Sequence, residues 1–155
     1  MKNKEHFKIE VKGLQKSYTN RKKDIVVALY SCDLQVKTGE FFAVLGESGC
    51  GKSSLLRVVA GLESYDFGDI YFDGIDSSTI SQIDKNMSFV SQNIVLFPHK
   101  TVYENLIVTL NINRLPKEDK IQRIQELSKL FGLDMLLNRK PRELSGGQQQ
   151  RVAIA

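Results

Sequence analysis

The 155-residue chain has few of the residues that mark secreted, membrane-spanning or metal-binding proteins. It contains no tryptophan, three prolines and two cysteines, Cys32 and Cys50, which show no metal-ligand spacing. So few cysteines indicate a reducing, cytoplasmic setting. No apolar run approaches the roughly 18–20 residues of a membrane span, and residues 1–10 lack a signal-peptide core. If the protein acts at a membrane, we expect a partner to supply the membrane-spanning segments.

An excess of charge of one sign is also nearly absent. Lysine and arginine outnumber aspartate and glutamate by 22 to 18, and the excess is concentrated within residues 1–23. This small bias is typical of a solvated face, whereas a nucleic-acid surface needs a stronger basic stripe with interleaved aromatic residues. We therefore expect no nucleic-acid partner.

The most informative stretch present is a glycine-rich loop, Gly46-Glu47-Ser48-Gly49-Cys50-Gly51-Lys52-Ser53, followed by Ser54. It reads Gly-x-x-x-x-Gly-Lys-Ser, the phosphate-binding P-loop pattern. The apolar run Phe41–Leu45 before it predicts a strand buried on both faces, and residues 53–60 after it predict a helix that Gly61 ends. The motif requires this order of strand, loop and helix.

The chemistry of this loop points to a nucleotide with Mg²⁺. Glycines at 46, 49 and 51 can adopt positive φ, so that successive N–H groups converge on one anion at a helix start. Lys52 suits the β- and γ-phosphates, and the Ser53 hydroxyl suits a bridging Mg²⁺. A chance match has odds of about one in a few hundred from average residue frequencies. By itself the loop fits kinases, GTPases, motors and transporter ATPases equally.

Strand patterns surround the P-loop in about residues 1–92. Phe7, Ile9 and Val11 alternate with charged residues, a turn is expected at Gly13, and residues 25–36 form a second extended segment. These segments predict an antiparallel sheet. Two further strands are expected at residues 69–74 and 87–91, the latter ending at Gln92. The predicted fold class is α/β.

Helical patterns occupy about residues 93–143. Thr101 and Glu104 have capping-box spacing, and apolar residues follow at intervals of four. A second helix is expected from Pro116, at its first helical position, to Gly132. Its apolar face consists of Ile121, Ile124, Leu127 and Phe131. We interpret this block as a helical insertion.

A second motif, Leu144-Ser145-Gly146-Gly147-Gln148, opens the helix-forming residues 149–155. Ser145 and Gln148 form a capping box, so the motif fits an ordinary helix N-terminus. It also fits an anion site, because a hydroxyl, two glycines and a helix dipole meet at one point. The residues alone leave both interpretations open.

Together the two motifs resemble the ATP-binding subunits of ABC transporters, whose signature is Leu-Ser-Gly-Gly-Gln. The likeness extends from Phe7 to Ala155. It implies a P-loop NTPase core with an N-terminal antiparallel part and a helical insertion, in a subunit that couples ATP hydrolysis to solute transport. A soluble ABC protein acting on nucleic acid or ribosomes is an alternative, although such proteins usually carry long insertions between the motifs.

The resemblance also assigns site residues. It implies that the ring of Tyr18 lies on adenine, the alternative being an exposed loop tyrosine, and that Gln92 reaches the Mg²⁺ held by Ser53. The signature would contact the γ-phosphate on the P-loop of a second ATP-binding subunit, identical or different, in a head-to-tail dimer. The signature residues concerned are Ser145, Gly146, Gly147 and Gln148.

Two segments resemble the importer branch of that family. Residues 96–105 look like the surface that receives a transmembrane permease subunit, which makes His99 a contact residue rather than a catalytic one. Residues 139–145 are similar to subunits that serve carbohydrates, polyamines or inorganic anions. An extracytoplasmic solute-binding protein is a further expected partner, and the subunit would lie on the inner face of the membrane.

The family pattern continues after the signature helix with a strand ending in aspartate, a catalytic glutamate and a switch histidine. These residues are not among the 155, and His6 and His99 lie at the wrong places for the switch. We therefore expect no catalytic residue here apart from the Gln92 contact. We also expect weak or no nucleotide binding, negligible hydrolysis, and an unpaired edge at Phe41–Leu45. A catalytically inactive nucleotide-binding fragment is thus the other alternative.

Overall fold

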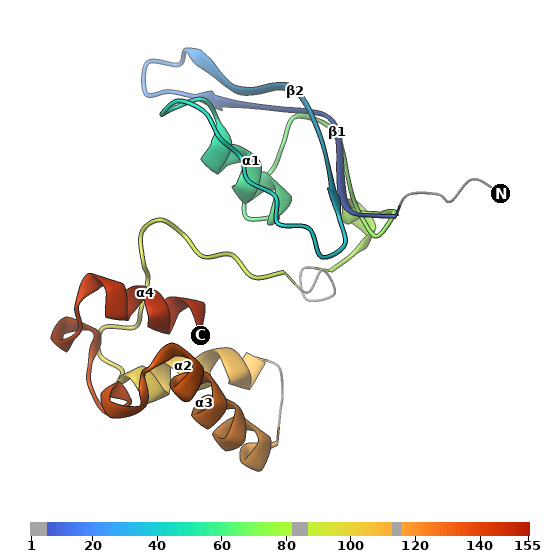
Figure 1. The fold of residues 1–155 in the computed structure, drawn as a ribbon. Coiled ribbons are helices and arrows are strands. Elements are labelled where there is room, and N and C mark those ends of the chain that lie inside the picture. Colours follow the sequence, from blue (N-terminus) through green and yellow to red (C-terminus); the bar gives the residue numbers. More distant parts are fainter. Residues whose placement is uncertain (1–5, 82–86, 113–115) are drawn as a thin grey trace. The chain divides into compact units, whose positions relative to one another are not determined.

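The structure is a computed structural model that describes residues 6–81, 87–112 and 116–155. The chain divides into two compact units, Met1–Phe89 and Val90–Ala155, which are described separately (Figure 1). No helix in these described ranges is both long enough and apolar enough to cross a membrane.

The first unit contains a four-stranded sheet in the order β2-β1-β3-β4, with every neighbouring pair antiparallel. Its strands are β1 (Phe7–Thr19), β2 (Ile25–Lys37), β3 (Phe67–Phe72) and β4 (Ile75–Asp76), followed by the single 3-10 turn η1 (Ser77–Thr79). The predicted antiparallel sheet is confirmed. The turn expected at Gly13 is wrong, because irregular register between Val11 and Leu14 keeps this glycine inside β1 with φ 56. Tyr18 consequently lies in a strand rather than a loop.

Helix α1 (Lys52–Val59) packs against one face of this sheet (Figure 1). Every buried residue of α1 is apolar, and the helix ends before Gly61, whose φ is 69. Burying each such side chain contributes about 1.5–3 kcal/mol, so the core fixes the helix start against the sheet. The core residues are Val11, Leu14, Leu29, Leu55, Val58, Val59, Ile70 and Phe72.

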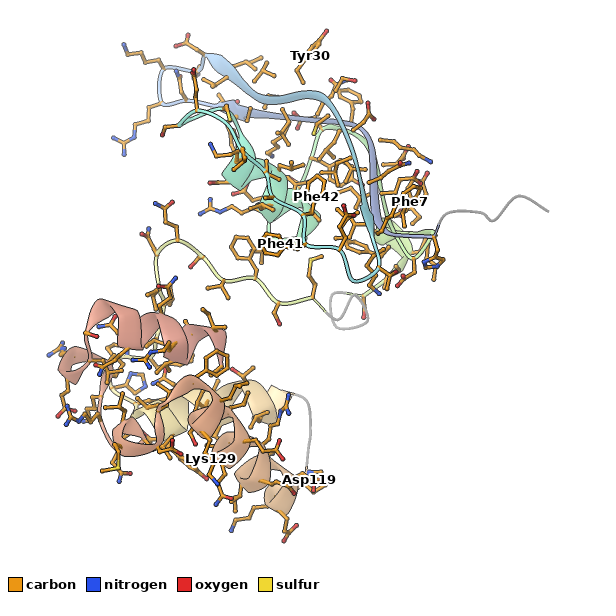
Figure 2. The ribbon with its side chains drawn as sticks, in the orientation of Figure 1. Phe7, Tyr30, Phe41, Phe42, Asp119 and Lys129 are labelled. Atoms are coloured by element: carbon orange, nitrogen blue, oxygen red, sulfur yellow. The ribbon has the colours of Figure 1, made fainter. Side chains whose placement is uncertain are left out.

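Two predicted strands, Phe41–Leu45 and Met87–Ser91, are wrong. Among the described residues neither run pairs with another strand, and a strand depends on hydrogen bonds to a neighbour. Phe41, labelled in Figure 2, is 96% exposed and Leu45 is 89% exposed, while Val44 between them packs against the core. Gln92 therefore does not end a strand.

The second unit is helical, with α2 (Val102–Ile112), α3 (Lys117–Phe131), α4 (Gly146–Ile154) and the single 3-10 turns η2 (Asp134–Leu136) and η3 (Pro141–Glu143). The predicted capping box of α2 is confirmed: the Thr101 N–H donates to Glu104 Oε2 at 2.6 Å, and the Glu104 N–H donates to Thr101 Oγ1 at 3.2 Å. Pro116 is the N-cap of α3 rather than its first residue, and Gly132 follows its end with φ 61. The buried core consists of Val102, Leu106, Leu110, Ile124, Leu133, Leu136, Leu144 and Val152.

Candidate functional site

The P-loop adopts the backbone expected of an anion-binding loop. Gly46, Gly49 and Gly51 have φ of 155, 83 and 94, as the sequence predicted. Gly51 is the N-cap residue of α1, so the loop leads directly into the first free N–H groups of that helix. The Ser53 side chain is exposed in the first helical turn. Backbone N–H groups and a partial positive charge thus lie at one point.

Gly51 also fixes the loop to the sheet. A Cβ atom at this residue would lie 2.2 Å from the Ala28 carbonyl oxygen and 3.1 Å from a methyl carbon of Leu29. Because the nearest obstacle is backbone of β2, it cannot move aside as a flexible side chain would. Only glycine allows this approach, and the helix start is therefore held at a defined place on β2.

Lys52 directs its ammonium into the loop. Its Nζ donates to the carbonyl oxygens of Gly46 at 2.9 Å and Glu47 at 2.6 Å, and lies 3.6 Å from Cys50 Sγ. An ammonium has three protons, and a thiol is a weak acceptor for the third. An anion at the helix start would offer a much stronger acceptor for that proton.

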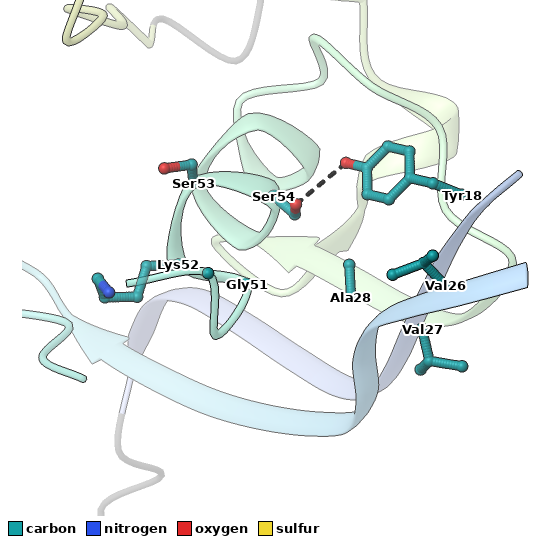
Figure 3. A pocket seen from close by; sticks show the side chains of 9 residues that line it. Tyr18, Val26, Val27, Ala28, Gly51, Lys52, Ser53 and Ser54 are labelled. Carbon is teal, nitrogen blue, oxygen red and sulfur yellow. Dashed lines mark hydrogen bonds between the residues drawn. The ribbon is translucent and has the colours of Figure 1, made fainter. Parts of the chain in front are cut away.

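A cavity of about 280 Å³ opens beside the loop (Figure 3). Strands β1 and β2 supply an aromatic and apolar wall, and residues of the P-loop and of the start of α1 line the other side. This chemistry fits a ligand with a flat apolar part and a polyanionic part. The lining residues are Tyr18, Val26, Val27, Ala28, Gly49, Gly51, Lys52, Ser53 and Ser54.

In the second unit, the signature motif forms the start of α4. The predicted capping box is confirmed: the Ser145 N–H donates to Gln148 Oε1 at 2.8 Å, and the Gln148 N–H donates to Ser145 Oγ at 3.3 Å. Apart from the chain neighbours and the helix's own backbone, no atom of the described residues lies within 4 Å of where a Cβ on Gly146 or Gly147 would sit. The exposed helix start is therefore open to an approaching group.

Comparison with known proteins decides the family. A family model described as ABC transporter matches residues 29–155, more than half of the chain. The chain belongs to the ABC transporter family. Its structure is similar to a solved structure described as "Dimeric Structure of MJ0796, a Bacterial ABC Transporter Cassette", with a TM-score of 0.83 and 33% identity, over 94% of this chain and 67% of that one. The predicted ABC ATPase fold class is confirmed.

Curated relatives are import ATP-binding proteins. The chain is 38% identical over 146 residues to the sn-glycerol-3-phosphate import ATP-binding protein UgpC of Bordetella avium, covering 94% of this chain and 39% of the relative. It is 44% identical over 135 residues to the trehalose/maltose import ATP-binding protein MalK of Thermococcus litoralis, covering 83% of this chain and 36% of the relative. The chain spans about two fifths of the length of the curated relatives it matches.

Tyr18 of this ABC protein lies in the cavity as a residue of β1 (Figure 3). Its hydroxyl lies 2.5 Å from Glu63 Oε2 and 3.0 Å from Ser54 Oγ, and Lys16 Nζ lies 5.0 Å from the ring centroid. The hydrogen bond with Glu63 raises the pKa of Tyr18 and lowers the pKa of Glu63. Sequence reasoning missed Glu63, because no local pattern links it to Tyr18, which lies 45 positions earlier in the chain.

The ABC signature residues and Gln92 belong to the second unit, Val90–Ala155, whereas Tyr18 and the P-loop belong to the first. Gln92 is exposed in an irregular segment. The structure therefore brings Tyr18 together with Gly49 and residues 51–54 around one cavity. Gln92 and Ser145 are not among the residues that line it. Within the described ranges there is no group of three or more His, Cys, Asp or Glu residues that could hold a metal.

Asn105, which sequence reasoning also missed, fixes the shape of residues 97–105. Its side chain is buried, accepts from the Phe97 N–H at 2.8 Å, and donates to the Thr101 carbonyl at 2.8 Å. The turn between these residues is thereby tied to the first part of α2. Phe97 itself is 47% exposed, with its ring edge-on to that of His99.

Labelling of Cys50 with a bulky maleimide should block nucleotide binding. The thiol is exposed in the P-loop, and an added group would displace Lys52 from its carbonyl partners or fill the loop. We expect an affinity loss of more than about tenfold for a fluorescent ATP analogue, equivalent to about 1.4 kcal/mol. Cys50→Ser is the control, because it leaves Cys32 as the cysteine that can be labelled. Cys32 is half-buried, and burial raises the pKa of its thiol, so it reacts slowly. Unchanged affinity after complete labelling at Cys50 would contradict the prediction.

Proposed function

We propose that the chain is the nucleotide-binding part of an ATP-binding subunit that couples ATP binding and hydrolysis to solute import. The observation that carries this proposal is the ammonium of Lys52 held inside a positive-φ glycine loop at the N-terminus of α1. The import ATP-binding names of the relatives support the direction of transport.

Each part of the cavity has a role in this proposal. The loop N–H groups and Lys52 bind the phosphates, and the Ser53 hydroxyl would hold Mg²⁺. The ring of Tyr18 stacks on adenine beside the apolar side chains of β2. When bound, the metal would neutralise part of the negative charge of the phosphates. The residues in contact with nucleotide are Gly46, Glu47, Ser48, Gly49, Cys50, Gly51, Lys52, Ser53 and Ser54.

A second subunit completes the site. The signature residues 145–148 present a hydroxyl, two unobstructed glycines and a helix N-terminus, which suit the γ-phosphate held by the other subunit's P-loop. The similar MJ0796 cassette is described as dimeric, which supports such an assembly. In this arrangement residues 1–92 carry the P-loop core, residues 93–143 the helical subdomain and residues 144–155 the signature.

The proposed subunit lies at the cytoplasmic face of the membrane and acts through other proteins. Residues 96–105, whose turn Asn105 holds in shape, bind a transmembrane permease subunit. An extracytoplasmic solute-binding protein delivers the solute to that permease. No specific observation favours a second function.

Replacing Lys52 with methionine tests the proposal. The change removes the ammonium while keeping an apolar side chain, so the fold is retained and phosphate affinity falls. The loss of charge-assisted hydrogen bonds worth about 1.5–3 kcal/mol should weaken binding of a fluorescent ATP analogue to the intact protein by about 10- to 100-fold. The matched control is Lys22→Met, an equal charge change in the exposed turn between β1 and β2. If Lys52→Met and Lys22→Met bound the analogue equally well, the loop would not be a nucleotide site.

A further inference from the structure

Glu63 lies two residues beyond Gly61, just after α1, and its carboxylate has two partners. Oε1 lies 3.1 Å from Arg57 Nη1, and Oε2 lies 2.5 Å from the Tyr18 hydroxyl. The Glu63 side chain is 24% exposed, so solvent screens this contact only in part. Glu63 does not line the cavity, whereas Tyr18 does.

The direction of the hydrogen bonds follows from the chemistry of the groups. A phenol has one proton, and an ionised carboxylate only accepts. Tyr18 therefore donates to Glu63, and its oxygen accepts the proton of the Ser54 hydroxyl, 3.0 Å away (Figure 3). The same hydrogen bond lowers the pKa of Glu63, which keeps the carboxylate ionised and accepting at neutral pH.

These contacts hold the Tyr18 ring from both ends of α1. Ser54 lies in the first turn of the helix and Glu63 beyond its last turn. Lys16, also from β1, places its ammonium over the ring. A tyrosine that is 37% exposed would otherwise exchange among several rotamers, and ordering it on ligand binding would cost free energy. The hydrogen bond to Glu63 orders the ring in advance.

We propose that Glu63 is a positioning residue for nucleobase recognition: it holds Tyr18 in place, so that it contributes to affinity for the base and not for the phosphates. This inference rests on the proposed function. A merely structural role, in which Glu63 and Arg57 stabilise the end of α1, would instead alter the helix start and weaken binding of base and phosphates together.

The test compares two probes, MgATP and inorganic tripolyphosphate, on the intact protein. Glu63→Ala should weaken MgATP binding by about three- to tenfold and leave tripolyphosphate affinity within about twofold. Tyr18→Phe keeps the ring and removes the hydroxyl, so it should produce the same change. Glu63→Gln keeps a carbonyl acceptor for the phenol and should restore most of the MgATP affinity.

The double variant, Tyr18→Phe with Glu63→Ala, should be no weaker than either single variant, because both remove one interaction. The matched control is Glu126→Ala on α3, which also removes a carboxylate paired with an arginine and should change neither affinity. The inference would be overturned if Glu63→Ala lost affinity equally for MgATP and tripolyphosphate, or lost affinity for neither. If the unmodified protein bound neither MgATP nor tripolyphosphate, the proposed function itself would fail, a distinct outcome.

Discussion

Replacing Gly51 with alanine should lower the free energy of unfolding of the first unit by about 2–6 kcal/mol and abolish nucleotide binding. At φ 94 an L-residue is strained, which costs about 1–3 kcal/mol. In addition, the new methyl group would lie 2.2 Å from the Ala28 carbonyl oxygen, so either α1 or β2 must move. Any such movement separates the loop N–H groups from Lys52, and the phosphate site is lost.

Gly49→Ala separates the two costs of this change. Gly49 also has positive φ, at 83, but in the described part of the chain no atom beyond its two neighbours lies within 4 Å of its Cβ position. Gly49→Ala should therefore lower the free energy of unfolding only by the cost of backbone strain, about 1–3 kcal/mol. Urea unfolding followed by circular dichroism gives the stabilities, and titration with a fluorescent ATP analogue gives the affinities. Equal stability of the Gly51→Ala and Gly49→Ala proteins would show that contact with β2 does not constrain the loop.

Local patterns accounted for the parts of the fold that depend on residues a few positions apart. The capping boxes at Thr101 and Ser145 join residues three apart, and both form as predicted. The P-loop glycines adopt positive φ for the same reason, since their conformations are set within the loop. The alternation in residues 7–11 likewise predicted strand β1.

Contacts between distant residues could not be read from the sequence. The apolar run at Phe41–Leu45 has the composition of a buried strand, but whether it pairs depends on neighbours elsewhere, and no described strand provides one. The hydrogen bond between Tyr18 and Glu63 spans 45 positions. The approach of Gly51 to Ala28 likewise joins a loop to a strand. These long-range contacts decide which way the cavity's residues point.

In the proposed transporter assembly, replacing Gly147 with aspartate should abolish ATP hydrolysis, while leaving the second unit folded. Beyond its neighbours and the backbone of α4, no atom that the structure describes lies within 4 Å of the Gly147 Cβ position, so the side chain has room among these residues. A carboxylate in the first turn of α4 also interacts favourably with the helix dipole, by about 0.3–1 kcal/mol. The thermal stability of the unit should therefore be unchanged or slightly higher.

The same carboxylate would lie where the γ-phosphate of the partner subunit is proposed to approach. Like charges repel there, and the group that stabilises the transition state is lost, so hydrolysis should fall by about 100- to 1,000-fold. Binding of the ATP analogue to the separate subunit should not change, because its own P-loop is intact. Gln150→Glu adds equal charge at an exposed position further along α4 and should retain activity. Full hydrolysis in Gly147→Asp would mean that the signature helix start does not contact nucleotide, since no folding defect could mask the result.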